Sequence, residues 1–410
     1  MKWGERLEKI DAPWHDVLMQ TRTPEPMDAS KQFCPNMACS ARGKTGEGNI
    51  RIHCRKRERY RCRTCGQTFS TRRGTMLEGL RKPTELVVIV VTLLSYGCPI
   101  QAIVHAFGLD ERTVASWRDR AGRHCEQMHH ALIEQGTLDL VHVQADEIRV
   151  KGRSMIAWMG LTMMVSTRLW LGGVVSLTRD TALADRMMRQ VRACSQAACS
   201  LLISTDGWAA YPNSITRAFR DKVKETVGRG RACLRVWPQL CIATVIKRTE
   251  KKHVVAVTRK MTRGTLERAA ALLQASQGGA TLNTAFIERL NGTVRERLAA
   301  LTRKCRHAAR RLDGLHRGMY LIGCTYNWCW PHQELRKAKH LGFACTPAMA
   351  SGLTDHIWSV KELLTYKVAP APWVEPIRRG RPRKQPMSDP VATRRARVRL
   401  RKGVLCSVTS

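Results

Sequence analysis

The chain has 410 residues and carries 70 Lys and Arg against 33 Asp and Glu, a formal net charge of +37. Hydrophobic residues make up 43% of the sequence, enough for buried cores, which excludes a chain disordered throughout. No apolar stretch reaches the roughly 20 residues of a membrane-spanning helix, and the N-terminus shows no apolar signal segment, so we expect neither a membrane protein nor a secreted one. We expect a cytoplasmic protein with a polyanionic partner.

Sixteen cysteines without an export signal indicate reduced thiols and metal ligands rather than disulfides. After a Pro-punctuated, loosely ordered lead-in over residues 1–30, residues 31–75 are too polar for an ordinary core. They contain two short-spaced cysteine pairs, Cys34 with Cys39 and Cys62 with Cys65. Each pair can supply two thiolates from one tight turn, which predicts a structural Zn²⁺ site. His53 or Cys54 could replace one ligand, and free surface thiols are the alternative.

Residues 80–132 show helical patterning and predict an all-α domain. A short helix over residues 99–106 leads through a Gly-containing turn to a second helix, which Asp110 can cap. Val114 and Trp117 are expected to face inward. This order is typical of a helix-turn-helix, in which exposed residues of the second helix reach the DNA major groove. The side chains predicted to do so are Arg112, Ser116 and Arg120. An ordinary helical hairpin is the alternative.

The rest of the chain is predicted to contain an α/β domain, an extension and a tail. Over residues 138–335, three strand-like runs at hairpin spacing precede a helix over 181–194, a short strand, a strand pair and late helices. This order predicts a mixed sheet. An extension over 336–368 is followed by a Pro- and Arg-rich tail over 369–410, expected to be disordered until bound. The His129–His130 pair has no partner pair at metal-binding spacing and is expected on a helix surface.

Carboxylates stand at three places where catalytic groups are common. Asp146 and its neighbour Glu147 lie on a predicted strand, whose side chains alternate between faces, so we expect only one of them in a given site. Asp206 follows the end of an apolar strand. Glu288 and Arg295 share a helix at a spacing that places them along one groove. Converging carboxylates would bind divalent cations, although a chain with 33 acids offers such groupings by chance as well.

Around these residues the sequence resembles bacterial insertion-sequence transposases of the DDE superfamily, in the branch with an N-terminal zinc ribbon and a helix-turn-helix. The resemblance covers about residues 30–365. The matching stretches are residues 59–70, 205–211, 283–297, 326–328 with His332, and 346–349. The stretch around Glu288 is the most specific of them.

The resemblance implies a multidomain α/β protein with a ribonuclease H-like catalytic domain and a DDE triad at Asp146, Asp206 and Glu288, with Asp146 preferred to Glu147 as the first acid. Two Mg²⁺ (or Mn²⁺) ions would serve hydrolysis at the ends of a mobile element and attack of the freed 3′-hydroxyl on target DNA. Arg295 would lie near the DNA phosphates. Joining two DNA ends implies at least a homodimer, acting at the bacterial nucleoid.

Two other functions remain open at this point. In the first, the protein is a non-catalytic, sequence-specific DNA-binding regulator or an inactive transposase derivative, and the acids only pair with Arg. In the second it binds RNA, which is disfavoured because only 6% of the residues are aromatic and no aromatic-rich sheet motif is present.

The tail contains an Arg-Gly-Arg-Pro core that resembles an AT-hook. Glycine lets the backbone enter a narrow A·T minor groove while flanking Arg side chains spread along it. The residues predicted to contact DNA are Arg379, Gly380, Arg381 and Pro382. A generic basic tail is the alternative.

Overall fold

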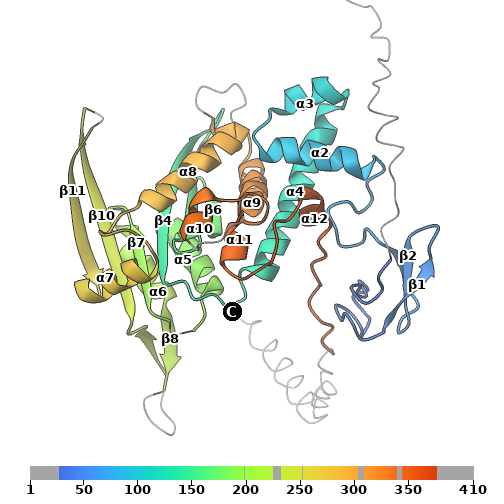
Figure 1. The fold of residues 1–410 in the computed structure, drawn as a ribbon, viewed down its shortest axis with the longest axis horizontal. Helices are drawn as coiled ribbons and strands as arrows, with labels where there is room; N and C mark the ends of the chain where they lie inside the picture. The colour runs from blue at the N-terminus through green and yellow to red at the C-terminus, as the bar shows by residue number, and fades with distance from the viewer. Residues whose placement is uncertain are drawn as a thin grey trace, which may run out of the picture. The chain divides into compact units, whose positions relative to one another are not determined.

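The structure, a computed structural model, describes residues 27–197, 199–224, 232–251, 253–302, 309–338 and 344–375 (Figure 1). These residues divide into two compact units. The smaller unit comprises residues 28–53, 60–68 and 370–375, and the larger comprises residues 27, 54–59 and 69–369. Among the described residues, no helix is long and apolar enough to cross a membrane.

A three-stranded sheet lies at the start of the described chain. Its strands, in spatial order, are β1 (Ile50–Cys54), β2 (Arg59–Cys62) and β3 (Thr68–Ser70). Phe33, Ile50 and Tyr60 are buried, and the Tyr60 hydroxyl donates to the carbonyl of Asp28 at 3.2 Å. So small an apolar core needs a further source of stability, which a bound metal would supply.

Three helices follow: α2 (Thr84–Ser95), α3 (Ile100–Phe107) and α4 (Glu111–Leu132). Helix α3 ends at Gly108, which adopts a left-handed conformation with φ 60°. The Asp110 carboxylate accepts the backbone N–H groups of Arg112 and Thr113 at 2.8 and 3.3 Å, which confirms the predicted cap. Val114 and Trp117 are buried, as predicted.

The larger unit contains a six-stranded sheet with the spatial order β11-β10-β7-β4-β5-β6. Its strands are β4 (His142–Lys151), β5 (Ile156–Met164), β6 (Trp170–Ser176), β7 (Leu201–Thr205), β10 (Leu240–Glu250) and β11 (His253–Arg263). Strand β7 is parallel to both β4 and β10, and the other pairings are antiparallel. The predicted mixed sheet in an α/β architecture is therefore confirmed.

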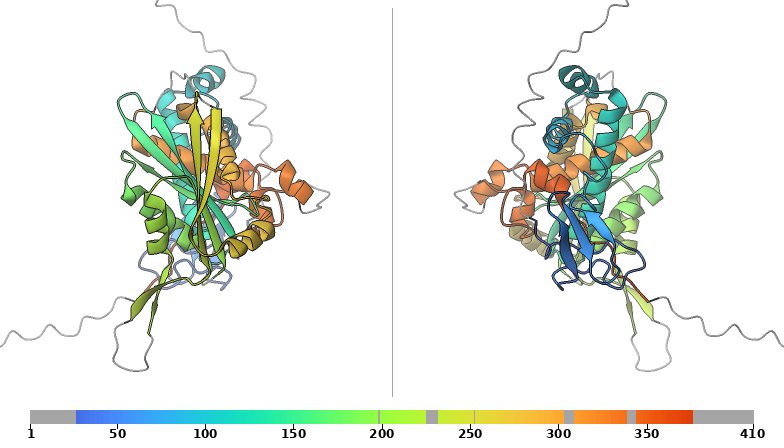
Figure 2. Two further views of the ribbon diagram at one scale, coloured as in Figure 1. Left: turned by 90° about the vertical axis from the view of Figure 1, so that its left-hand side faces the viewer. Right: turned by 90° about the vertical axis from the view of Figure 1, so that its right-hand side faces the viewer.

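Helices cover both faces of this sheet (Figure 2). On one face α5 (Thr181–Cys194) and α6 (Ala210–Ala218) pack against Val143 and Ala145 of β4. On the other face lie α7 (Leu266–Ala275), α8 (Ala285–Arg297) and α9 (Leu312–Trp328). Val143 and Ala145 of β4 thus face α5 and α6. Ile148 and Val150 of the same strand lie on the opposite face and join the core formed with α8 and α9.

The smaller elements complete the larger unit. They are β8 (Arg220–Val223), β9 (Cys233–Val236), the 3₁₀ turn η1 (Ala299–Leu301), α10 (Gln333–Ala338), α11 (Pro347–Ala350) and α12 (Val360–Thr365). Helix α8 ends at Arg297, because Leu298 adopts an extended conformation directly after it.

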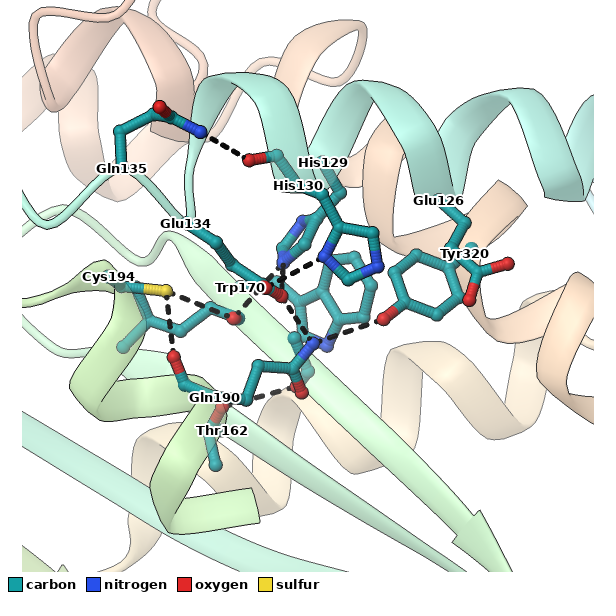
Figure 3. A network of polar contacts seen from close by, with 12 residues as sticks. Glu126, His129, His130, Glu134, Gln135, Thr162, Trp170, Gln190, Cys194 and Tyr320 are labelled. Carbon is teal, nitrogen blue, oxygen red and sulfur yellow. Dashed lines mark hydrogen bonds and ion pairs between the residues drawn. The ribbon is translucent and has the colours of Figure 1, made fainter. Parts of the chain in front are cut away.

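A polar network holds α4, α5 and α9 against β6 (Figure 3). His129 is fully buried, its Nε2 lies 3.2 Å from a carbonyl oxygen of β6, and burial lowers its pKa to about 4. Gln190 donates to Glu134 Oε1 at 2.7 Å and to the Tyr320 hydroxyl at 3.0 Å. The predicted surface position is therefore wrong for His129, although its neighbour His130 is half-exposed.

Candidate functional site

The candidate site lies where the central strand of the sheet stops. Strand β7 ends at Thr205, and both of its parallel neighbours continue past that point, to Lys151 in β4 and to Glu250 in β10. Asp206 therefore stands at the carboxyl end of a short strand between two longer ones. Functional groups are common at this end of parallel strands in open α/β sheets.

Three carboxylates form what we call the acid cluster: Asp146, Glu147 and Asp206 each place an oxygen within 4.8 Å of the others. Asp146 accepts from Asn291 of α8 at 2.7 Å, and Glu147 accepts from the Tyr211 hydroxyl of α6 at 2.8 Å, so the two neighbours do face opposite sides. The expectation that only one of them joins a site is nevertheless wrong. Because Asp206 lies beyond the end of β7, its carboxylate reaches both.

Glu288 lies outside the acid cluster. Its carboxylate accepts from the Thr284 hydroxyl at 2.6 Å and forms an ion pair with Lys247 of β10. It is still close enough for its charge to raise the pKa of Asp146. Of the three predicted acids, the structure thus brings Asp146 and Asp206 together and holds Glu288 nearby at an exposed position.

Arg179 is a member of the site that sequence reasoning missed. Its guanidinium forms an ion pair with Glu147 and lies 3.4 Å from Asp206 Oδ2. It also stacks over the rings of Trp208 and Trp158, at 4.6 and 5.2 Å from their centroids. Arg179 belongs to the loop between β6 and α5, where no motif marks it, so no local signal could have identified it.

Burial and mutual repulsion both oppose ionisation of the acid cluster. Burial raises the pKa of Asp146 to about 7, and the charges of Glu147, Asp206 and Glu288 add to the shift. Burial and Asp206 likewise raise the pKa of Glu147. Among the described residues, Asn291 Oδ1 is buried without a hydrogen-bond partner. Clustered carboxylate oxygens beside an unused amide oxygen fit a hard divalent cation such as Mg²⁺.

The four predicted zinc ligands are together in the smaller unit, with their Sγ atoms within 4.8 Å of one another. Cys34 Sγ lies 3.6 Å from Cys65 Sγ, and Cys39 Sγ lies 3.9 Å from Cys62 Sγ. Zn–S bonds of about 2.3 Å in a tetrahedron place the sulfurs roughly 3.8 Å apart. The cysteine cluster therefore fits a structural Zn²⁺ ion.

Tight turns bring each cysteine pair together. The backbone N–H of Cys39 donates to the carbonyl of Asn36 at 3.2 Å. The N–H of Gly66 donates to the carbonyl of Cys62 at 3.0 Å, and Gly66 has a φ of 71°, where glycine is favoured. His53 and Cys54, considered as substitute ligands, are not part of the cluster.

The predicted DNA-contacting residues of α4 differ in their surroundings. Arg112 and Ser116 are exposed. Arg120 departs from the expectation, because its guanidinium donates to the backbone carbonyls of Met76, at 3.1 Å, and Glu78. These bonds hold the segment before α2 against α4, so Arg120 has a structural contact rather than a free side chain.

The remaining predicted DNA contacts lie on α8 and in the tail. Arg295 is exposed on α8, about one turn past Asn291. The AT-hook-like residues lie outside the described part of the chain: Arg379, Gly380, Arg381 and Pro382.

Comparison with known proteins assigns no family. No protein-family model matches the sequence, and no curated protein is significantly similar to it. The function is therefore inferred from the residues and their geometry.

Proposed function

We propose that this chain is a DNA transposase, which binds the ends of its mobile element, hydrolyses phosphodiesters with divalent cations and joins the 3′-hydroxyl to target DNA. The observation that carries the proposal is the proximity of Asp206, just past the end of β7, to Asp146 in the adjacent parallel strand β4. Helix α8 crosses the same place and bears Glu288, Asn291 and Arg295. Of these three, the family resemblance gives a role to Glu288 and to Arg295.

The fold supports the proposal at the level of architecture. Three antiparallel strands, β4 to β6, are followed by the parallel strands β7 and β10, with helices on both faces of the sheet. This mixed arrangement is compatible with a ribonuclease H-like domain. In this proposal a zinc ribbon and a helix-turn-helix precede the catalytic domain.

Asp146, Asp206 and Glu288 would hold the cations, with Glu147 beside them. Bound Mg²⁺ supplies activation of the attacking oxygen and neutralisation of the leaving one. The bond from Asn291 fixes the orientation of the Asp146 carboxylate. Glu288 rests in a largely exposed ion pair, and such pairs are weak, so its carboxylate can turn toward Asp146 at little cost.

Basic surfaces would bind the DNA. Residues 51–73 contain nine Lys and Arg against one acid, and Arg112 and Ser116 are exposed on α4. Neutralisation of phosphates by such groups gives strong, salt-dependent affinity for duplex DNA. Cutting and joining two ends would require at least a homodimer.

One observation favours a second candidate, a non-catalytic DNA-binding regulator. Arg179 pairs with Glu147 and Asp206, and Lys247 pairs with Glu288, so the acids are already balanced in part by cationic side chains. In a regulator these pairs would be structural, and the protein would bind DNA without cleaving it.

Strand cleavage separates the two candidates. A labelled duplex carrying the gene's own flanking end is incubated with the full chain in Mg²⁺, Mn²⁺ or EDTA. We expect nicking and joining that need the cation and disappear in Glu288→Ala, with DNA binding retained. Glu296→Ala, an exposed acid on the same helix, is the matched control and should remain active. Binding without cleavage by the wild type in either cation would support the regulator.

A further inference from the structure

The edge of the large sheet ends in a long, exposed two-stranded ribbon formed by β10 and β11 (Figure 1). Beyond Val245 the residues of β10 are exposed, and so is every residue of β11 except Met261. Residues 247–263 contain seven Lys and Arg and a single acid. An exposed, basic ribbon of this length has no evident role in the core of the fold.

The register of the two strands places one face of the ribbon next to the acid cluster. Ile246 packs against the loop after Asp206, because a Cβ added at Gly207 would lie 3.2 Å from Ile246 Cγ1. Ile246 pairs with Thr258. Arg248 follows Ile246 by two residues in β10, and Lys260 follows Thr258 by two residues in β11. Because the strands are antiparallel, these two cations lie on opposite sides of the pair. Side chains two residues apart share a face. We call the surface of Ile246, Arg248, Thr258 and Lys260 the ribbon face.

The basic residues on the two sides of the ribbon differ in their contacts and exposure. On the side toward α7 and α8, Lys247 pairs with Glu288, and Arg259 donates to the carbonyl of Leu282 at 2.8 Å. On the ribbon face, the Arg248 side chain is 75% exposed and forms an ion pair with the exposed Glu250, and Lys260 is exposed. The ribbon face therefore presents cationic groups that the fold does not require.

We infer that the ribbon face binds the sugar-phosphate backbone of duplex DNA and directs it toward the acid cluster. This inference rests on the proposed function, which makes DNA the polyanion. Arg248 and Lys260 would each neutralise a phosphate, and the pair of Ile246 and Thr258 lies between these two cations along the ribbon, with Ile246 beside the loop after Asp206. A two-stranded ribbon also has dimensions that a major groove admits.

Charge argues against a second copy of this chain as the occupant. Strand β11 is an edge strand and could pair with another β11. Its Arg259, Lys260 and Arg263 would then approach the same residues of the partner, and like charges across strands repel. A register shift between Arg248 and Thr249 also interrupts the ladder near the tip. DNA satisfies the charges that a second copy would oppose.

The salt dependence of duplex binding tests this inference without relying on cleavage. Binding of the full chain to a fluorescent 30-base-pair duplex is measured between 50 and 300 mM NaCl without added divalent cation. Each phosphate contact contributes about 0.9 to the slope of log K against log salt concentration. We expect R248A/K260A to lower the magnitude of the slope by about 1.8 and R248K/K260R to restore it. R189A/K222A removes two exposed cations from α5 and β8 and should leave the slope unchanged.

The possible slopes distinguish failure of the ribbon-face inference from failure of the proposed function. A reduced slope in R248A/K260A alone supports the ribbon face even if the protein proves inactive in cleavage. An unchanged slope in a variant that melts like the wild type overturns the inference and leaves the proposed function standing. If R248A/K260A keeps the slope of the wild type but changes from dimer to monomer, β11 would be assigned to self-association. No duplex binding by the wild type would overturn both proposals.

Discussion

Asn291 of α8 donates a hydrogen bond from Nδ2 to Oδ2 of Asp146 in β4 across 2.7 Å. The other oxygen of Asp146 accepts the backbone N–H of Glu147 at 2.8 Å. The helix that carries Glu288 is thereby tied to the strand that carries the first acid. Asp146 is held in one orientation even though burial penalises its charge.

Asp146→Asn is expected to stabilise the protein at pH 8 but not at pH 4. Burial raises the pKa of Asp146 from 3.8 to about 7, so between these values the folded state retains a proton that the unfolded state releases. Stability therefore falls as the pH rises through this window. Above pH 7 the penalty is on the order of 1–3 kcal/mol, which the uncharged amide avoids. Thermal unfolding without divalent cations measures it, and an equal gain at both pH values would contradict the account.

Arg179→Ala is expected to lower the free energy of unfolding by about 2–4 kcal/mol, because the Glu147 side chain is only 2% exposed and would lose its cationic partner. Added Mn²⁺ should restore part of the loss by taking over the neutralisation of the acids. Arg217→Ala breaks the more exposed pair with Asp185 and should cost less than about 1 kcal/mol. Thermal melts with and without Mn²⁺ measure these effects. A loss that Mn²⁺ leaves unchanged would argue against a cation site beside Arg179.

Cys62→Ser is expected to abolish stoichiometric zinc binding, because three thiolates and a hydroxyl form a much weaker site than four thiolates. Cys54→Ser is the matched control, since Cys54 of β1 lies between the two cysteine pairs in the sequence but outside the cysteine cluster. Metal analysis of the purified proteins should find about one zinc per chain in the wild type and the control, and little in Cys62→Ser. A full equivalent of zinc in Cys62→Ser would disprove the assignment.

Arg112→Ala should weaken DNA binding and Arg120→Ala should lower stability, although both residues lie on α4. Arg112 is exposed, so its loss should weaken duplex binding about tenfold and leave the melting temperature unchanged. Arg120 donates to two backbone carbonyls, so its loss should cost about 1–3 kcal/mol of stability. Binding titrations and thermal melts are compared for the two variants. Weaker binding by a fully stable Arg120→Ala would show that the guanidinium also reaches DNA.

Much of the fold follows from local pattern. The helix predicted over residues 181–194 coincides with α5, because its apolar period and the capping Asp180 act within the segment. Each cysteine pair is brought together by its own tight turn, which its short spacing predicts. The cap of α4 at Asp110 was predictable for the same reason.

Features that depend on contacts between distant segments were not predictable. Arg179 reaches Asp206 only because the loop before α5 folds over the end of β7. His129 is buried because β6 and α9 pack against α4, which the polar sequence around it does not indicate. From strand alternation we expected that Glu147 would not share a site with Asp146. That prediction is wrong because alternation gives no information on how far Asp206 lies past the end of its strand.

Titration with Mn²⁺ shows whether the acid cluster binds a divalent cation. Free Mn²⁺ is followed by electron paramagnetic resonance as it is titrated with the full chain, its Asp206→Asn variant and the control Asp119→Asn, whose side chain is similarly exposed. We expect binding by the wild type and the control, and at least about tenfold weaker binding by Asp206→Asn. Equal binding by all three proteins, or no binding by the wild type, would contradict this expectation.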